Sequence, residues 1–475
     1  ELRWLVMRET LIHTARSRPL MLWLDDLHRA PADTFQRLAR LHRDMTSVPV
    51  LLIGTMRNED VVSDTTARAR VELLLDEVGG ERMEIEPMDV HETHSLLRET
   101  LPLSDRAVSI AAKRAKGNPL FALQLLHAWA LRGELKLQAG VYQVPDVALG
   151  TPAETTADLW EERVAALQEK LRPAALAASA LGGDIRRDVL KQLLTALGLE
   201  AKRAINAMRR AQLLLPSGTD RLRWTHTLLL EHLLKQLKLQ PDAAVVFREA
   251  ADALARHPAA RSGRITRHRV TNLVRAGDLE QAALVLHSHI ERSWQEVRDP
   301  SATLRDLSLL DGRLTGLAQA RQLRWRSEAQ RYSGALAEAR HDGELARRMF
   351  HEAGDRHSEV KVLRLLGHIA SDLGASAQGR RLVLQALSYF ERHEDVHGQA
   401  QCGALLGEID YLLGEHARAR DELANAADRF LAVGDSLGRA QCLILEGFVE
   451  QASSAPHRAR ELLAVARADL ERIGY

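Results

Sequence analysis

The stretch EDVHGQAQCGALLGEIDYLLGEHARARDELANAADRFLAV at residues 394–433 is followed at 434–473 by GDSLGRAQCLILEGFVEQASSAPHRARELLAVARADLERI, and the two decide the fold of the C-terminal half. A shift of 40 residues aligns glycine, alanine and phenylalanine positions over the last 160 residues. The aligned sets are Gly354, Glu394 and Gly434, each followed by Asp; Gly367, Gly407 and Gly447; Gly334, Gly374 and Gly414; Ala337, Ala377 and Ala417; and Phe350, Phe390 and Phe430. Each period holds two helical stretches, such as Val360–Leu373 and Ala377–Phe390. The pattern predicts an α-solenoid of helical hairpins similar to TPR repeats.

Small residues at fixed places in each repeat let neighbouring helices approach closely, and the recurring Phe closes the second helix against its neighbour. The segment 276–282 has the same spacing from Gly to Ala. We therefore expect helical hairpins from near residue 242 and assign 241–475 to the repeats. Cys402 and Cys442 occupy the same place in successive repeats, so two small buried side chains account for them more simply than a redox pair.

The composition favours a mainly helical protein of several domains. The 475 residues suffice for roughly three domains or an extended array, and aromatic residues make up only 4%, which favours long helices over β-sandwiches. With 65 basic and 64 acidic residues interspersed, a net charge of +1 argues against a protein that coats nucleic acid or binds membranes through basic segments. No apolar run is long enough to cross a bilayer, and the first residues resemble no signal peptide. We expect a soluble, cytoplasmic protein.

Residues 1–90 predict part of an α/β core. Two apolar runs, PLMLWLDD at 19–26 and VPVLLIGTMR at 48–57, flank the helical pattern of Thr34–Met45. A strand, a helix and a second strand in this order form a βαβ unit, so we expect a parallel sheet that is buried on both faces. A third short strand is expected at Arg82–Ile85.

The next two segments predict mainly helices. From residue 90 to about 140, Asp89 is expected to cap Val90–Thr100, Ser104 to cap a helix through Lys116, and Pro119 to start a helix that runs to Leu131. In residues 151–240, the expected elements are helices at Leu159–Leu181, Asp188–Leu197 and Ala201–Gln212, a hairpin at Leu213–Trp224 and a helix from His226. Three helices and a hairpin fit a winged-helix-like module, and a helical bundle with one ordered loop fits equally well.

The first strand ends in two carboxylates, Asp25 and Asp26. Ligands of open α/β sheets bind at the carboxyl ends of the strands, where one carboxylate can hold the Mg²⁺ shell and the other can orient water. The second strand leads to Arg57, whose guanidinium could bind a γ-phosphate. Two simpler interpretations stay open: an acidic exit loop for the carboxylates, and a surface salt bridge for Arg57.

Four motifs in this order resemble those of STAND-class AAA+ ATPases, such as MalT-like and related multidomain bacterial regulators. LDDLHRA at 24–30 is similar to their Walker B segment, LIGTMR at 52–57 to the sensor 1 strand, KGNPLF at 116–121 to the GxP motif of the lid, and LRWTH at 222–226 to the winged-helix segment that ends in a nucleotide-sensing His. The resemblance covers residues 1–240. It implies that 1–90 are the C-terminal part of the AAA+ core, 91–150 a helical lid and 151–240 a winged-helix module, before a sensor arm of repeats.

The resemblance also implies roles for single residues with ATP, ADP and Mg²⁺ as cofactors. Asp25 would organise Mg²⁺, and Asp26 would polarise the attacking water. Arg57 would sense the γ-phosphate, and Pro119, in the motif that begins at Gly117, would pack on the adenine. His226 would bind the β-phosphate of ADP in the resting state, or would simply be a capping or core histidine. The loop after Walker B departs from the family pattern: Arg29 replaces Trp and Pro31 replaces Asp.

The phosphate-binding loop G-x-x-x-x-G-K-[S/T] does not occur in the sequence. The chain also begins without Met, so we expect that loop on an upstream segment. Because backbone amides of the loop cradle the phosphates, residues 1–475 alone are expected to bind nucleotide poorly or not at all and to be inactive as an ATPase.

The leading hypothesis is therefore part of an ATP/ADP-controlled signalling switch that regulates transcription or an attached effector. A protein or small molecule would bind the repeat arm, and activation would involve self-oligomerisation. Three alternatives stay open: a non-enzymatic repeat scaffold with a vestigial ATPase core, the regulatory part of a multidomain protein kinase or cyclase, and a winged helix that binds DNA. The near-neutral charge argues against direct nucleic-acid binding.

Overall fold

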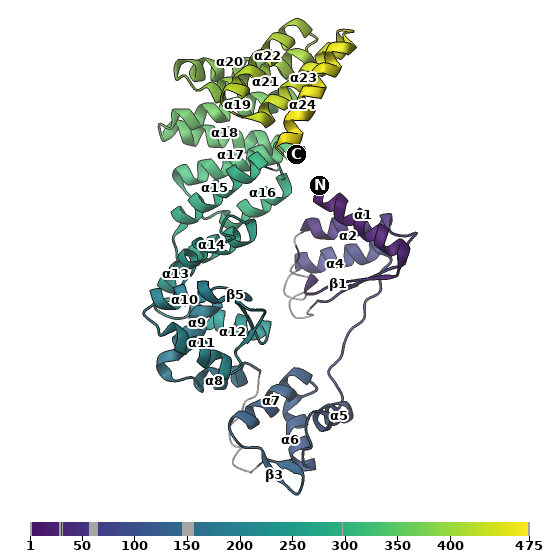
Figure 1. The fold of residues 1–475 in the computed structure, drawn as a ribbon, viewed down its shortest axis with the longest axis vertical. Helices are drawn as coiled ribbons and strands as arrows, with labels where there is room; N and C mark the ends of the chain where they lie inside the picture. Colours follow the sequence, from purple (N-terminus) through teal and green to yellow (C-terminus); the bar gives the residue numbers. More distant parts are fainter. Residues whose placement is uncertain are drawn as a thin grey trace. The chain divides into compact units, whose positions relative to one another are not determined.

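The computed structural model describes residues 2–27, 30, 32–56, 65–144, 156–296 and 298–473, and the chain divides into two compact units, Glu1–Ala166 and Leu167–Tyr475. Figure 1 shows that helices dominate both units. The expected fold class, mainly α with a small α/β part and a helical solenoid, is confirmed. None of the helices in the described ranges is long and apolar enough to span a membrane.

The N-terminal part of the first unit is the expected βαβ arrangement. It consists of α1 (Leu2–Ser17), β1 (Leu20–Leu24), α2 (Ala32–Asp44), β2 (Val50–Gly54) and α4 (Thr65–Val78). The strands pair in parallel, with Leu20 opposite Val50 and Leu24 opposite Gly54. The predicted parallel sheet is confirmed, and the two strands end side by side.

The expectation of a sheet buried on both faces is wrong for the residues that the structure describes. Leu22, Leu24, Val50 and Leu52 pack against the side chains of α1, α2 and α4. On the opposite face the alternate residues are exposed, with Trp23 at 66%. The reason is that the three helices contribute to clusters on the same side of the sheet. The expected third strand at Arg82–Ile85 is also wrong, because this segment is irregular and pairs with none of the strands in the described ranges.

The remainder of the first unit is a small helical group. It comprises α5 (Val90–Thr100), α6 (Asp105–Ala115), α7 (Pro119–Leu131), β3 (Lys136–Gln138), β4 (Val141–Gln143) and α8 (Thr156–Ala165). The predicted caps are confirmed: Asp89 accepts from the backbone N–H of Glu92 at 2.7 Å in a capping box, and Ser104 caps α6. Leu97, Val108, Leu125 and Trp129 form the core, and the β3–β4 hairpin was not expected.

The second unit begins with a winged-helix-like module. Its elements are α9 (Arg172–Ser179), β5 (Asp184–Arg186), α10 (Arg187–Ala196), α11 (Ala201–Arg210), β6 (Leu214–Pro216), β7 (Arg221–Trp224) and α12 (Thr227–Lys238). The three strands form an antiparallel sheet in the order β5-β7-β6, so the hairpin is confirmed and the plain helical bundle is excluded. The expected single helix Leu159–Leu181 is wrong. It divides into α8, a 3₁₀ turn η3 (Glu169–Leu171) and α9, whose first turn contains Pro173.

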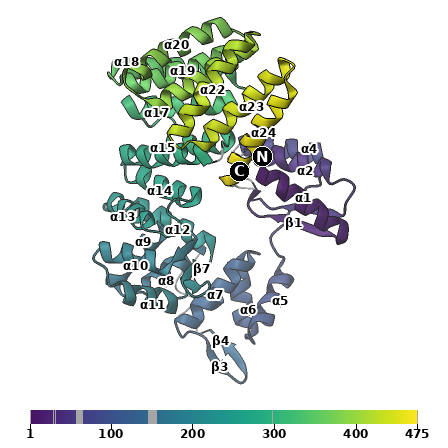
Figure 2. The same cartoon turned by 45° about the horizontal axis from the view of Figure 1, so that its top comes forward.

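The rest of the second unit is the solenoid, whose successive helix pairs are stacked in Figure 2. Its helices are α13 (Ala243–Ala255), α14 (Gly263–Arg275), α15 (Leu279–Glu296), α16 (Pro300–Leu307), α17 (Gly316–Tyr332), α18 (Leu336–Glu352), α19 (Arg356–Asp372), α20 (Ser376–Arg392), α21 (Val396–Leu412), α22 (His416–Ala432), α23 (Ser436–Ala452) and α24 (Pro456–Arg472). A 3₁₀ turn, η4 (Ser308–Leu310), follows α16. The helical hairpins from near residue 242 are therefore confirmed.

Glycines repeat every 40 residues because the chain needs them for two different reasons. Gly334, Gly374 and Gly414 lie in turns with φ between +79° and +83°, a left-handed conformation that side chains disfavour. Gly407 lies inside α21, where an added Cβ would come 2.5 Å from Leu423 Cγ on α22. The predicted close approach of paired helices is confirmed at this position.

The first helices of successive pairs, α17, α19, α21 and α23, contact one another in series. Between α15 and α16, Arg298 donates through Nη1 to the Tyr332 hydroxyl at 2.8 Å and through Nη2 to Gln441 Oε1 on α23 at 3.5 Å. The row of first helices therefore curls back on itself, and it forms the inner face of a superhelix. The two cysteines are buried at Cys402 and Cys442, and burial raises the pKa of both thiols to about 12, which agrees with a packing role.

The solenoid is joined firmly to the winged-helix-like module. The carbonyl oxygen of Ala180, at the end of α9, accepts a hydrogen bond from Asn272 Nδ2 on α14 at 2.9 Å and lies 3.0 Å from His268 Nε2. Asn272 is fully buried, and a Cβ on Gly182 would come 2.8 Å from the His268 ring. These contacts tie α14 to the end of α9.

Candidate functional site

The two carboxylates of the predicted ATPase site lie in a tight turn directly after β1. Thr55, the residue after β2, donates from Oγ1 to Asp25 Oδ1 at 2.5 Å and accepts from the backbone N–H of Asp26 at 3.1 Å. The backbone N–H groups of Leu27 and Thr55 add two cross-strand bonds, to Thr55 O and Leu24 O. The turn is therefore fixed to the end of the neighbouring strand.

The backbone of this turn is unusual. Asp26 has φ +54°, in the left-handed region, which Asp tolerates better than most residues. A Cβ on Gly54 would come 2.8 Å from Leu27 Cδ2, so the exit loop packs closely against β2. The consequence is that Asp25 is exposed and Asp26 is half-buried at the carboxyl edge of the sheet. Departures from ordinary backbone geometry concentrate at functional sites, which is consistent with a site here.

The donor set suits Mg²⁺ that is carried by a nucleotide. Mg²⁺ in such sites takes one or two protein carboxylates, and waters and phosphate oxygens complete its shell. Asp25 offers one oxygen beyond the one that Thr55 holds. Among the described residues no group of three or more His, Cys, Asp or Glu side chains could hold a metal ion alone. Arg57, the third predicted residue of this site, lies outside the described residues.

The predicted lid motif forms one turn between α6 and α7. Gly117 has φ +79°, and a Cβ there would come 2.4 Å from Met88 O. Its own carbonyl accepts from the backbone N–H of Met88 at 2.9 Å, and Asn118 caps α7 by accepting from the N–H of Phe121 at 3.0 Å. Pro119 occupies the first turn of α7 and is exposed. Gly117 is thus required by the backbone, whereas Pro119 is available for a contact with a ligand.

His226 is the N-cap residue of α12, as the capping alternative expected, but its side chain makes no capping hydrogen bond. It is half-buried and lies two residues after the end of β7, the strand next to both other strands of the small sheet. His226 belongs to the second unit, whereas Asp25, Asp26, Gly117 and Pro119 belong to the first.

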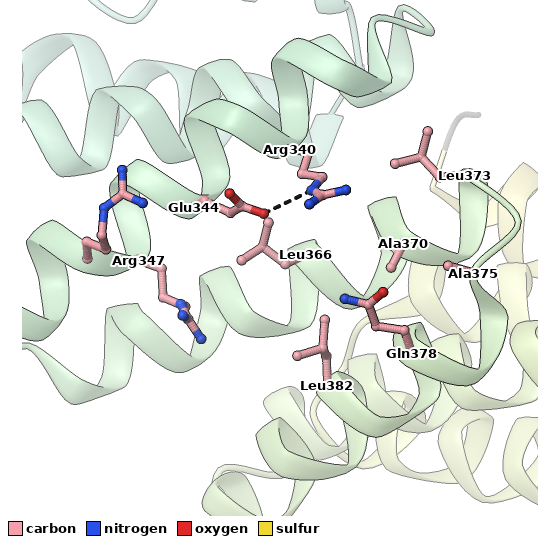
Figure 3. A pocket seen from close by; sticks show the side chains of 10 residues that line it. Arg340, Glu344, Arg347, Leu366, Ala370, Leu373, Ala375, Gln378 and Leu382 are labelled. Atoms are coloured by element: carbon pink, nitrogen blue, oxygen red, sulfur yellow. Dashed lines mark hydrogen bonds and ion pairs between the residues drawn. The ribbon is translucent and has the colours of Figure 1, made fainter.

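A cavity of about 480 Å³ in the solenoid is lined by residues of α18, α19 and α20 (Figure 3). Arg340, Glu344, Arg347 and Arg348 line it from α18, and Arg340 pairs with Glu344 at 2.9 Å. Leu366 and Leu382 are among the apolar residues that complete the lining. The cavity is basic at α18 and apolar towards α19 and α20. None of the residues predicted from sequence lies in it.

Sequence reasoning missed Thr55 although a signal was present. A hydroxyl residue directly after a strand, beside a strand that ends in two carboxylates, is placed to bond to one of them, here Asp25. The cavity had no such signal, because its lining comes from three helices with no common sequence pattern.

Comparisons with known proteins found no matching family and no matching curated protein. Solved structures do match. A Signal Transduction ATPase with Numerous Domains (STAND) protein with a tetratricopeptide repeat sensor, from Pyrococcus horikoshii, is 14% identical, with 98% of this chain and 76% of that chain covered and a TM-score of 0.35. A Rap protein complexed with Competence and Sporulation Factor is 13% identical, with coverage of 51% and 64% and a TM-score of 0.37. The apo form of RapI is 14% identical, with coverage of 66% and 77% and a TM-score of 0.32.

Proposed function

We propose that the chain is part of a nucleotide-controlled switch of the STAND type. In this proposal the edge of the β1–β2 sheet binds the phosphate end of ATP with Mg²⁺, and the solenoid is the arm that binds a regulatory ligand. The observation that carries the proposal is the turn at Asp25 and Asp26. Its carboxylates sit at the carboxyl end of a parallel strand, and Thr55, the residue after the neighbouring strand, bonds to the Asp25 carboxylate and to the backbone N–H of Asp26.

Each carboxylate has a distinct role in the proposal. Asp25, which is exposed and oriented by Thr55, would hold Mg²⁺, and the ion would supply positive charge to the phosphates. Asp26 orients the water that attacks the γ-phosphate, and the bond to the β-phosphate oxygen breaks to release ADP and phosphate. Arg57 follows β2 and contacts the γ-phosphate, and Pro119 packs on the adenine. Such sites work by position and charge, so a fixed turn suits the task.

The second unit supplies the regulatory part. His226 binds the β-phosphate of ADP in the closed state, and the solenoid opens that state when a ligand binds it. The buried joint at Ala180 supports this coupling, because it ties α14 of the arm to the winged-helix-like module that carries His226. A ligand that binds the open state more tightly shifts the population towards it. Opening would then expose surfaces for self-oligomerisation and for control of an effector.

The test uses the protein together with an upstream phosphate-binding loop, because amides of that loop bind the phosphates. Titration calorimetry measures ATP and ADP affinity with Mg²⁺, and phosphate release measures hydrolysis. Asp26→Asn is expected to keep the ATP affinity within about threefold and to lower hydrolysis by at least about 10²-fold, in the range of general-base losses. Asp76→Asn, a change at an exposed carboxylate on α4, is the matched control and leaves both unchanged.

A second candidate, a non-enzymatic scaffold, has one specific observation in its favour. The motif at Gly117 is fully explained by the left-handed turn, the contact with Met88 and the cap of α7, without any nucleotide. If the protein with its phosphate-binding loop shows no ATP or ADP binding, the scaffold is the correct function. If hydrolysis is the same in Asp26→Asn and in wild type, Asp26 has no part in the reaction.

A further inference from the structure

Four basic side chains on the inner face of the solenoid form no ion pair with any residue in the described ranges. Arg321 and Arg324 lie on α17, and Lys361 and Arg364 lie on α19. We call these four residues the inner cation cluster. Elsewhere in the solenoid buried carboxylates take up such arginines: Arg380 pairs with Asp410 at 2.9 Å, Arg439 with Asp469 at 3.0 Å and Arg326 with Asp342 at 2.6 Å.

The members of the inner cation cluster lie close enough to influence one another. Burial lowers the pKa of Lys361, and Arg324 on the neighbouring first helix lowers it further. The guanidinium of Arg324 also lies over the ring of Trp325, 4.2 Å from its centroid, which restricts where the charge can point. A cation lowers the pKa of another cation only when the two are near each other, because charge interactions in solvent fade within about a Debye length of 8–10 Å.

A buried histidine marks the edge of this region. His287 on α15 is only 8% exposed, and its Nε2 atom is buried with no hydrogen-bond partner among the described residues. Burial lowers its pKa to about 4, with Arg324 and Arg321 adding to the effect, so the imidazole is neutral at pH 7. The Nε atom of Arg364 is likewise buried without a partner. Buried polar atoms in native proteins almost always have partners, so each of these two atoms points to a ligand group that would supply one.

Three carboxylates act on these cations: Glu291 on α15, Glu328 on α17 and Asp395, which caps α21. Glu291 and Asp395 raise the pKa of Lys361, and Glu291 and Glu328 act on Arg324. None of the three lies within ion-pair distance of a cluster member in the part of the chain that the structure describes. The cations therefore outnumber the carboxylates, and their guanidinium groups have no ion pair with them.

We propose that the inner cation cluster binds a phosphate monoester group of a small-molecule ligand, with Arg324 and Arg364 as its principal contacts. A phosphate monoester carries about −1.5 to −2 charges at pH 7 and three acceptor oxygens, so it can bind two guanidinium groups at once, whereas a single carboxylate carries one charge on two oxygens. Guanidinium groups bind phosphate oxygens in pairs of parallel hydrogen bonds. The phosphate also offers acceptors for the unpartnered Arg364 Nε.

This inference rests on the proposed function only for the regulatory role of the ligand, because it names the chemical class of ligand that the solenoid would bind. Its test needs no ATP, so the two can fail separately. Inorganic phosphate is the probe, titrated into the full chain by calorimetry at constant ionic strength, with chloride replaced to compensate. Citrate, which carries only carboxylates, is titrated in the same way.

Four variants locate the site. Arg324→Gln and Arg364→Gln each remove one charge from the cluster and keep a long polar side chain. Arg381→Gln removes an exposed charge from α20 and is the control, and Arg347→Gln removes a charge from the cavity at α18. Circular dichroism establishes that each variant is folded.

We expect one phosphate site, with affinity at least tenfold weaker in Arg324→Gln and in Arg364→Gln and unchanged within twofold in Arg381→Gln and Arg347→Gln. Citrate is expected to bind at least tenfold more weakly than phosphate. Absence of saturable phosphate binding in wild type overturns the proposal. Loss of binding in Arg347→Gln alone would move the site to the cavity, and equal or tighter citrate binding would overturn the assignment of the ligand class.

Discussion

Substituting Gly407 and Gly447 by alanine tests whether the 40-residue repeat reflects helix contacts or only local preference. The two glycines occupy the same place in successive repeats, inside α21 and α23. A Cβ on Gly407 would lie 2.5 Å from Leu423 Cγ and 3.2 Å from Ala419 O. At Gly447 the nearest atom, Leu463 Cγ, would be 3.3 Å away, and Ala459 O 3.6 Å. The two sites thus match in sequence context and differ in the space between the paired helices.

The expected magnitudes follow from these gaps. Carbon atoms pack best at about 3.5–4.0 Å, so Gly407→Ala forces α21 and α22 apart by about 1 Å, while Gly447→Ala needs only a few tenths of an ångström. Overpacking of this kind costs about 1–3 kcal/mol. Both variants gain about 1 kcal/mol from the better helix propensity of alanine. Because that gain cancels in the comparison, Gly407→Ala should be less stable than Gly447→Ala by about 1–3 kcal/mol, and Gly447→Ala should be close to wild type or slightly more stable.

Native-state hydrogen exchange is the suitable assay, because repeat arrays open locally and a single unfolding transition is not expected. Amides of α21–α24 report the free energy of opening for the last two repeats in wild type and both variants. Equal losses in the two variants would refute the reasoning from helix contacts. A greater loss in Gly447→Ala would show that the gaps in the structure do not control packing.

Three further predictions concern the solenoid. Glu394 has φ +54° at a place where other repeats have Gly. Glu394→Gly should therefore raise the free energy of opening by about 0.5–1 kcal/mol, since relief of about 1–2 kcal/mol of left-handed strain exceeds the extra entropy of an unfolded glycine. If the strain were absent, only the entropy of glycine would act, and amides around this turn would exchange faster than in wild type. Because burial raises the pKa of Cys402 and Cys442 to about 12, neither should react with iodoacetamide at pH 8 until the protein unfolds. Rapid alkylation of the native protein, detected by mass spectrometry, would contradict this. The hydrogen bond from His397 lowers the pKa of Asp435, so this carboxylate stabilises the fold at pH values above its unfolded pKa near 3.9. The stabilisation is lost as the pH falls through the lower pKa of the folded state. Acid titration of helicity should therefore show a shallower loss in Asp435→Asn than in wild type, and identical acid profiles would contradict this.

The repeats could be predicted from the sequence because their signals are local. The turn at Gly374 needs a residue with a left-handed backbone conformation, and the close helix pair at Gly407 needs a small residue. The same residues therefore recur at the same spacing. The caps at Asp89 and Ser104 were predictable for the same reason, since each involves residues within three positions.

Other features depend on parts of the chain that are far apart in sequence. Apolar residues on both faces of β1 indicated burial on both, but burial depends on what covers each face, and the helices that the structure describes cover one. Strand β5 was missed because three residues with one apolar side chain carry no pattern, and it exists because β7 pairs with it. The inner cation cluster could not be predicted either, because its members meet only through the packing of α17 on α19.

The buried joint between α14 and the winged-helix-like module has a mechanical consequence. A coil of helices held by neighbour contacts is a spring, and a ligand on its inner face changes the pitch. Since Asn272 is fully buried and donates a hydrogen bond to Ala180, we expect α14 and the winged-helix-like module to rotate together. We expect small changes of pitch, summed over the helix pairs from α13 to α24, to rotate the module that carries His226.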